Sequence, residues 1–435
     1  MNAPLGAAAV RRRFLVLTAT RWLPTGLLLP LMVVMMQERG LSLTTIGLLW
    51  AVQGVVVLVL ELPTGGLADA AGRRPVLLGA GTLSLAATIV WAFAGNVTWF
   101  VVAMAVDGIY RALESGPLES WYVDASQAAD PDVDIESGLA RKGLVLGVAI
   151  AAGALLGGGL ALVPQPDALP VLALPLLVSA AMRLGDLAAI AALLVEVRPW
   201  RGMDTPAVSR RPAMPWQGAG TTIAGAARLL RASPALVALA AIEMVWGAGM
   251  TGVELLSAPR MVELVGDARS GIGAIAVAGA VAWSISGVGA NLAPWLARIT
   301  GSWVGAAIVT RIVQGAAVAA AAVVAGPAGL LTAYLGFYLV HGAANVAHYG
   351  LVHRNVGPEH RATMVSVNSL TSRVGGTVAG PVLGAVATAA GIPAAFGVCA
   401  VLLALPAPLY LVARNRPDAS PPPPEAVVRG AMTGG

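Results

Sequence analysis

Long apolar stretches alternate with short polar segments along the whole chain. About twelve windows hold roughly 20 or more mostly apolar residues, the length that a helix needs to cross a bilayer. In the first half they lie at 14–36, 43–66, 77–95, 98–118, 141–163 and 169–195, and in the second at 234–257, 270–293, 303–325, 328–350, 363–387 and 391–413. None alternates like a barrel strand. The pattern therefore predicts an all-α integral membrane protein with two groups of six helices.

The composition agrees with this prediction. Of 435 residues, 57% are hydrophobic and 11% are charged, whereas soluble domains carry about 25% charged residues. A soluble enzyme is therefore excluded, and the single cysteine, Cys399, excludes a disulfide scaffold. The sole lysine, Lys142, is followed by glycine and cannot complete a Walker loop, so neither ATP-driven pumping nor any other cofactor is expected.

The basic residues predict how the helices are oriented. If the amino terminus is cytoplasmic, 19 of the 27 basic residues fall on inner segments, 3 on outer loops and 5 inside helices. The positive-inside rule then places both termini in the cytoplasm of a multi-pass protein of the plasma membrane. Because these charges are spread over many short loops, they indicate contact with the lipid bilayer and not with nucleic acid.

A polar segment divides the chain into two halves. We expect an N-terminal half at 1–197, a cytoplasmic linker at 198–233, a C-terminal half at 234–413 and a disordered tail at 414–435. A weak internal repeat, offset by 227 residues, relates Gly153-Ala154-Leu155-Leu156-Gly157 to Gly380-Pro381-Val382-Leu383-Gly384. Parallel six-helix repeats of this kind are typical of a large class of transporters.

The most specific motif lies between the second and third predicted helices. Its sequence, Gly65-Gly66-Leu67-Ala68-Asp69-Ala70-Ala71-Gly72-Arg73-Arg74, resembles the Gly-x-Leu-Ala-Asp-Arg-x-Gly-Arg-Arg/Lys motif of the major facilitator superfamily, with Ala70 replacing an arginine. The preceding Glu61-Leu62-Pro63-Thr64 is similar to the drug:proton antiporter branch. The resemblance implies a twelve-helix fold and a conformational latch between the halves. The latch residues would be Gly65, Asp69, Gly72, Arg73 and Arg74.

The fourth predicted helix carries three charges on one face. Asp107, Arg111 and Glu114 are spaced i, i+4, i+7, and such charges at bilayer depth must face protein or a water-filled cavity. Arg111 resembles the arginine near the proton site of proton-coupled family members, so we predict that the three residues couple transport to protons. We expect Arg21 and Glu61 to join them in one cavity charge network. The alternative is a fixed structural ion pair.

The second half offers candidates for substrate binding. Glu243 and Trp246 could contact a cationic or amphipathic molecule, although Glu243 could instead pair with Arg311 or Arg373. His341, Asn345 and His348 form another i, i+4, i+7 stripe. Too few ligands surround the two histidines for a metal site, so we predict no metal and assign His341 and Asn345 to the cavity lining. Trp22, in the first half, completes the predicted binding residues.

Glycines on two predicted helices suggest close packing that could serve gating. Gly153, Gly157, Gly380 and Pro381 belong to small-xxx-small patterns. They are similar to the Gly-x-x-x-Gly-Pro-x-x-Gly-Gly motif of family antiporters, but here the fifth helix has Ala154 in place of proline and the Gly-Pro pair lies in the eleventh. Ordinary close packing is the alternative.

These features together predict a secondary transporter and not an enzyme. We expect proton-coupled multidrug efflux of a small amphipathic molecule by a monomer working through alternating access, with protons as the coupling ion. One alternative is a proton symporter or facilitator for uptake of a sugar or organic acid. A non-transporting membrane sensor is a second, although the longest polar segment is only the linker of about 40 residues.

Overall fold

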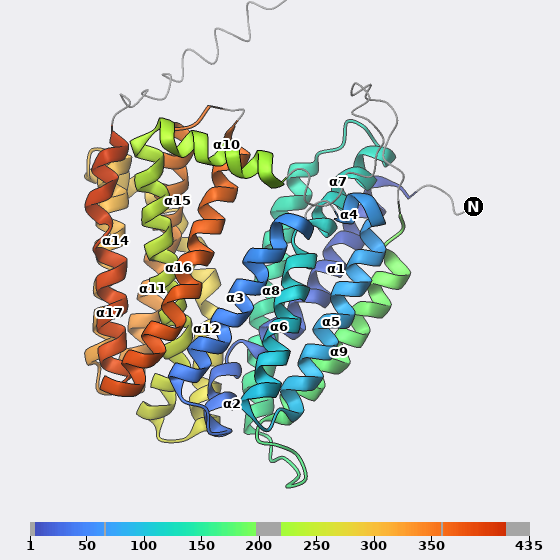
Figure 1. The fold of residues 1–435 in the computed structure, drawn as a ribbon, viewed down its shortest axis with the longest axis vertical. Coiled ribbons are helices and arrows are strands. Elements are labelled where there is room, and N and C mark those ends of the chain that lie inside the picture. Colours follow the sequence, from blue (N-terminus) through green and yellow to red (C-terminus); the bar gives the residue numbers. More distant parts are fainter. Residues whose placement is uncertain (1–4, 65–66, 197–218, 358–359, 415–435) are drawn as a thin grey trace, which may run out of the picture.

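The computed structural model describes residues 5–64, 67–196, 219–357 and 360–414, and these residues form helices without any strand. Of the predicted features, Gly65, the linker up to residue 218 and the tail from residue 415 lie outside the described residues, as does the side chain of Asp69. The described helices stand side by side in two groups, and the two groups diverge toward one end (Figure 1).

The first group contains the helices of the N-terminal half. They are α1 (Ala7–Leu28), α2 (Met32–Glu38), α3 (Leu43–Thr64), α4 (Leu67–Ala71), α5 (Arg73–Phe93), α6 (Val97–Glu114), α7 (Pro117–Ala129), α8 (Ile135–Leu162) and α9 (Ala173–Leu193). The short helices α4 and α7 lie at the end where the groups diverge, which is also where α10 (Ala219–Ala232) lies (Figure 1). We call it the linker end, and we call the other the opposite end.

The second group repeats this order. It contains α11 (Pro234–Val265), α12 (Ala268–Ala290), α13 (Ala293–Ile299), α14 (Trp303–Val323), α15 (Pro327–Arg354), α16 (Arg361–Ala390), α17 (Ile392–Ala404) and the 3₁₀ helix η2 (Ala407–Arg414). The short helix α13 follows the second long helix of its group, as α4 does in the first. Helix α10 falls inside the predicted linker, where no helix was expected, and its Leu229 and Leu230 pack on the C-terminal half.

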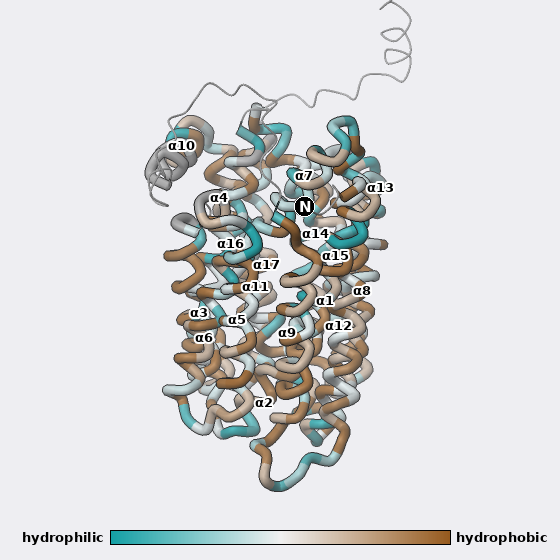
Figure 2. Tube along the Cα trace, turned by 90° about the vertical axis from the view of Figure 1, so that its right-hand side faces the viewer, coloured by the Kyte–Doolittle hydropathy of each residue, from teal (hydrophilic) through white to brown (hydrophobic). Residues whose placement is uncertain are grey.

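The helices have the length and surface of membrane spans. Among the described residues, ten helical segments are long and apolar enough to cross a bilayer, and the first of these joins α1 to α2. Helices α6 and α16 run alongside them (Figure 1). Large apolar side chains such as Leu144, Val288 and Val323 are exposed, and hydrophilic residues concentrate at the two ends of the bundle (Figure 2). Lipid contact explains this exposure of apolar surface.

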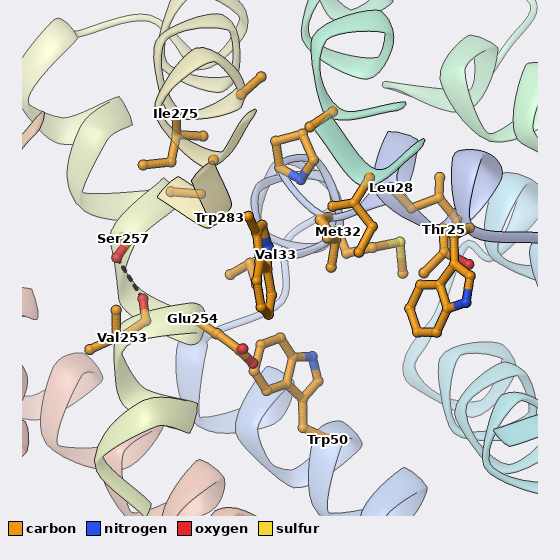
Figure 3. Close-up of a pocket in the computed structure, with 18 of the residues that line it drawn as sticks. Thr25, Leu28, Met32, Val33, Trp50, Val253, Glu254, Ser257, Ile275 and Trp283 are labelled. Atoms are coloured by element: carbon orange, nitrogen blue, oxygen red, sulfur yellow. Dashed lines mark hydrogen bonds between the residues drawn. The ribbon is translucent and has the colours of Figure 1, made fainter. Parts of the chain in front are cut away.

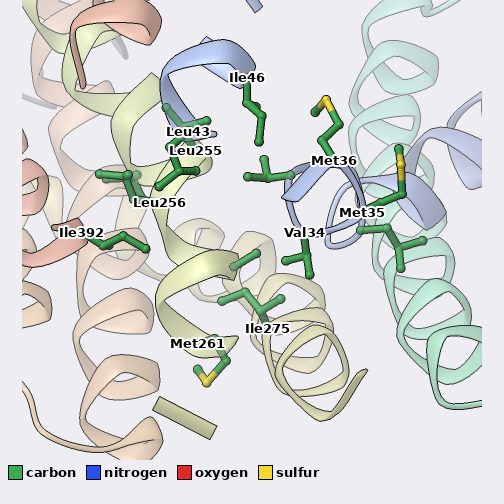
Figure 4. Packing of buried hydrophobic residues seen from close by; sticks show 14 of the residues in the cluster. Val34, Met35, Met36, Leu43, Ile46, Leu255, Leu256, Met261, Ile275 and Ile392 are labelled. Atoms are coloured by element: carbon green, nitrogen blue, oxygen red, sulfur yellow. The ribbon is translucent and has the colours of Figure 1, made fainter. Parts of the chain in front are cut away.

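Among the described residues, the apolar core is continuous between the halves at the opposite end. There, Val34, Met36 and Ile46 of the N-terminal half belong to one cluster with Leu256 and Ile275 of the C-terminal half (Figure 4). At the linker end each half has a cluster of its own. The halves are therefore joined by hydrophobic burial at one end and packed separately at the other.

Helices α3 and α16 approach each other closely at the boundary between the halves. A Cβ on Gly47 of α3 would collide with the backbone of Gly380 on α16, and a Cβ on Gly384 would collide with Leu43. Only glycine permits backbones to come this near. Beside this contact, the Thr44 hydroxyl donates to the Thr388 hydroxyl at 2.9 Å.

Arg39 fastens the turn between α2 and α3 to the opposite end of the N-terminal half. Its guanidinium donates to the carbonyls of Trp91 at 2.7 Å, Ala92 at 3.1 Å and Val171 at 2.8 Å. Partial burial lowers the pKa of Arg39 to about 10, so the side chain stays charged at neutral pH. A cation suits the carbonyl-rich C-terminus of α5.

Substitution of Gly47 should loosen the contact at the opposite end. Overpacking at a tight site costs about 1–3 kcal/mol, and each 1.4 kcal/mol is tenfold in population. We consider the protein with Thr44→Cys and Thr388→Cys, in membranes. In this background we expect Gly47→Leu to slow oxidative cross-linking between the two introduced cysteines by about tenfold. The buried native Cys399 should not interfere.

The matched control is Gly79→Leu, because a Cβ on Gly79 meets nothing within 4 Å. That variant should cross-link at the parental rate. Equal cross-linking of the Gly47 and Gly79 variants would contradict the tight contact between α3 and α16.

Candidate functional site: a central cavity

A cavity of about 410 Å³ lies between the two halves. Helices α1, α2, α3, α5, α6, α8 and α9 contribute to its wall from one side, and α11, α12 and α15 from the other. Its aromatic lining residues are Trp22, Trp50, Trp91, Trp283, Tyr334 and Tyr338. Size and lining suit a small organic molecule, since ligand sites of about 300–1,000 Å³ are usually apolar with a few polar groups. Figure 3 shows part of this wall.

The polar part of the N-terminal wall consists of an ion pair and of Thr25, Gln53 and Arg183. The buried Asp107 carboxylate accepts hydrogen bonds from Arg111 Nε at 2.9 Å and from Gln53 Nε2 at 2.5 Å. Asp107 is 2% exposed, whereas the side chain of Arg111 is 40% exposed, and all three residues line the cavity. The carboxylate is therefore held in the wall while the guanidinium remains accessible from the cavity.

A second pair lies beside the first. Arg21 Nε of α1 is 3.8 Å from the Glu114 carboxylate, and neither residue lines the cavity. The helical spacing thus brings Asp107, Arg111 and Glu114 to one side of α6 but divides the carboxylates between two arginines. On α9, Arg183 donates to the Ser84 hydroxyl, and Asp186 accepts from Thr20 at 2.6 Å.

Glu61 lies elsewhere than in the predicted network. Its carboxylate is 3.3 Å from Arg373 Nε on α16, so it forms a salt bridge between the two halves and not with Arg21. The reason is that α3 packs against α16 along the interface, which turns Glu61 toward the other half. The position of Glu61 along its predicted helix gave no information about the direction of its side chain.

A buried polar network occupies the interior of the C-terminal half. The Glu243 carboxylate lies 3.8 Å from Arg311 Nη2 and 3.3 Å from His348 Nε2. Tyr410 on η2 accepts from Arg311 at 3.2 Å and hydrogen bonds to His348 Nδ1 at 2.9 Å. Asn368 on α16 hydrogen bonds to His348 Nε2 at 2.9 Å. Glu243 thus pairs with Arg311, which was the alternative to substrate contact.

The network continues toward the centre of the same half. Arg311 donates to Gln314 at 3.0 Å, and Gln314 reaches His341 Nδ1 at 3.4 Å. Asn345 hydrogen bonds to His341 Nε2 at 2.9 Å, and Trp246 stacks on His341 with ring centroids 5.4 Å apart. Of the predicted binding residues, only Trp22 is among those that line the cavity, since the other four face α14 and its neighbours. No metal cluster is found in the described part of the chain.

The loop with the specific motif is anchored within its own half. Arg73 Nη1 lies 2.6 Å from the Asp124 carboxylate of α7. The backbone N–H of Arg74 donates to Glu196 at 2.6 Å, and its guanidinium donates to the Ala191 carbonyl at 2.5 Å. Gly72 has φ +94°, in the left-handed region where a side chain would be strained, so the turn requires glycine. These contacts join the start of α5 to α7 and to the end of α9.

A family model of the major facilitator superfamily matches residues 14–379. The chain belongs to that superfamily. Solved structures agree on the fold: a variant of the nucleoside transporter NupG is 12% identical, with TM-score 0.76 over 93% of this chain and 100% of that one. A bacterial homologue of the human lysosomal transporter Spinster, inward-facing and occupied, is 15% identical, with TM-score 0.74 over 95% and 97%. The human organic anion transporter TETRAN is 18% identical, with TM-score 0.61 over 94% and 100%. Comparison with curated protein sequences gives no match.

The superfamily fold explains the positions of the conspicuous glycines. Gly153 and Gly157 pack α8 against the backbone of α1 at Leu23 and Leu27, inside the N-terminal half. Gly380, followed by Pro381, faces Gly47 across the interface. The two glycine patterns therefore serve different contacts, one within a half and one between the halves.

Gln53 and Glu254 are two of the cavity residues that the sequence reasoning missed. Gln53 carries no charge and does not stand out among the polar residues of the chain. Glu254 lay three residues from the end of its predicted window, but α11 continues to Val265, so the carboxylate lies well inside the helix and lines the cavity. A carboxylate inside a long apolar helix was the signal that could have identified Glu254. Because the predicted window ended at residue 257, Glu254 was expected near the end of the helix and not inside it.

Removal of Arg311 should destabilise this superfamily member strongly. Breaking a buried pair leaves an uncompensated charge and costs about 3–5 kcal/mol. We expect Arg311→Leu to lower the midpoint of thermal unfolding in detergent, and Glu243→Leu added to it to restore part of the loss. Glu263→Gln, which breaks an exposed pair with Arg260, should leave the midpoint within experimental error. An unchanged midpoint for Arg311→Leu would contradict this account.

Proposed function

We propose that the chain is a proton-coupled exporter of small amphipathic molecules that works by alternating access. The observation that carries the proposal is the Asp107–Arg111 pair in the wall of a cavity shared by both halves. A carboxylate at this depth is costly unless it is compensated. A group that can take up a proton is thus placed beside the site where a substrate would bind.

Asp107 has the contacts that proton coupling requires. While it is ionised, it holds Arg111 at 2.9 Å and Gln53 at 2.5 Å. A proton on the carboxylate removes the charge that holds the guanidinium, and Arg111 is then free to turn farther into the cavity. Binding of a proton and movement of Arg111 are thereby linked, which is the kind of differential interaction that shifts a conformational equilibrium.

The distribution of the core supports alternating access. A shared apolar cluster joins the halves at the opposite end, whereas separate clusters fill them at the linker end. With the basic linker end in the cytoplasm, as the positive-inside rule favours, this is a state in which the halves are closed toward the outside. Rocking of one half against the other would reverse the arrangement.

Two sets of contacts at the linker end are suited to regulate this rocking. The Glu61–Arg373 bridge crosses the interface, and the Arg73–Asp124 bridge holds the motif loop on α7. We assign the latch to Gly72, Arg73 and Arg74, together with Gly65 and Asp69. In this assignment Arg73 and Arg74 position the loop, and the halves meet over it when the linker end closes.

Loss of Arg111 should abolish proton-driven transport. In everted vesicles acidified inside, we expect the protein to accumulate ethidium, and Arg111→Ala to lower the initial rate by about tenfold or more, since a charged hydrogen bond is worth about 1.5–3 kcal/mol. Membrane content should be unchanged. The control is Arg269→Ala, which removes an exposed arginine at the opposite end of the bundle.

Other outcomes of the same assay would contradict the proposal. Wild-type accumulation by Arg111→Ala would refute the coupling role. Accumulation of uridine or a sugar in right-side-out vesicles, driven by an acid exterior and without ethidium export, would instead establish the proton symporter.

A further inference from the structure

The charges buried among the helices can be matched in pairs, with one remainder. Six carboxylates fall in the apolar windows of the sequence, together with the five arginines counted inside helices; they are Arg21, Arg111, Arg183, Arg311 and Arg373, and Glu61, Asp107, Glu114, Asp186, Glu243 and Glu254. Four salt bridges use four of each. Arg183 and Asp186 lie one turn apart on α9 and interact electrostatically, while each hydrogen bonds to a hydroxyl group, that of Ser84 and that of Thr20. Within the described part of the chain, Glu254 is the carboxylate left over.

Glu254 is deep in the molecule and yet accessible. It lies eleven residues before the end of α11 at Val265, which is about 16 Å at 1.5 Å per residue. Its neighbours Val253, Leu255 and Leu256 are buried, whereas its own side chain is exposed. Because Glu254 lines the cavity, that exposure is to the cavity.

The carboxylate has no hydrogen-bonded partner among the described residues. Arg111 acts on it electrostatically from the other wall, but the Arg111 Nε–H is donated to Asp107. An ionised carboxylate at this depth needs a countercharge. Because Arg111 is already paired with Asp107, a cation that enters the cavity, or a proton, would supply it.

Aromatic rings surround the position where that countercharge would lie. Glu254 points into the cavity on the side where the rings of Trp50 and Trp283 lie (Figure 3). Trp283 is 45% exposed, and its ring centroid is 6.3 Å from Tyr338, which is itself 4.9 Å from Tyr334. Aromatic faces attract cations, and tryptophan does so best.

We propose that Glu254, Trp50 and Trp283 form a binding subsite for an organic cation with an apolar or aromatic body. The subsite rests on the proposed function, because it lies in the same cavity and names the class of molecule transported. An anion would meet uncompensated negative charge, and a neutral molecule would leave Glu254 unpaired. A small inorganic cation would need several oxygen ligands, which this apolar wall does not offer. A proton on Glu254 neutralises the same charge, so protons and the cation compete for the subsite.

The test measures binding of tetraphenylphosphonium to the full chain purified in detergent, without any gradient. Tetraphenylborate, of the same shape and opposite charge, is the control ligand. We expect the wild type to bind the cation and not the anion, and to bind it more weakly as the pH is lowered. Glu254→Gln should reduce the affinity by about tenfold or more and remove the pH dependence, and Glu254→Asp should retain most of the binding.

Further variants separate charge from packing. Trp283→Ala should weaken binding by about threefold or more, and Trp283→Phe less, as expected for a cation over an aromatic face. Glu263→Gln removes a carboxylate of the same helix outside the cavity and should bind like the wild type. If Glu254→Gln does not fold, the subsite is tested by the other measurements. These are binding by Glu254→Asp and by the Trp283 variants, and the pH dependence of binding by the wild type.

Three outcomes would overturn the subsite: no binding of tetraphenylphosphonium by the wild type, equal binding of tetraphenylborate, or wild-type affinity and pH dependence in Glu254→Gln. The proposed exporter fails separately. If an uncharged amphipathic dye is exported in an Arg111-dependent manner while Glu254→Gln has no effect, transport stands and the cation subsite does not.

Discussion

The requirement that charge inside a bilayer be compensated governs the interior of this protein. Each arginine in the middle of a helix lies near a carboxylate from its own helix or from a neighbour. These pairs fix which faces of α1, α3, α6, α9, α11, α14 and α16 point inward, because the alternative is a charge in lipid. The pairing therefore determines how each helix is oriented about its axis, and so which side chains line the cavity.

The two halves use the same requirement differently. In the N-terminal half the Asp107–Arg111 pair lies in the cavity wall, with its carboxylate buried and its guanidinium accessible. In the C-terminal half Glu243, Arg311 and His348 are sealed among hydrogen-bonding side chains and make a rigid interior. One half thus has an ion pair on the cavity, and the other has a buried polar network behind the cavity wall.

The sequence predicted the fold more fully than the site. Apolar windows located the long helices, and the motif around Gly72 identified the superfamily, because both signals depend on local composition. Side-chain direction depends on how each helix is rotated, which is decided by packing between segments far apart in the chain. Asp107 and Trp22 line the cavity, whereas Glu243, Trp246 and His341 lie behind its wall and Glu61 faces Arg373. Glu254 was not recognised because its predicted window ended at residue 257, whereas the helix continues to Val265.

The meeting of Gly47 with Gly380 has a mechanical consequence. At this point two backbones touch with no side chains between them. Interlocked side chains must change rotamer before one helix can roll over another, but two smooth backbone surfaces need not. The two halves can thus tilt about the crossing of α3 and α16, and a large change of tilt there requires little rearrangement of side chains.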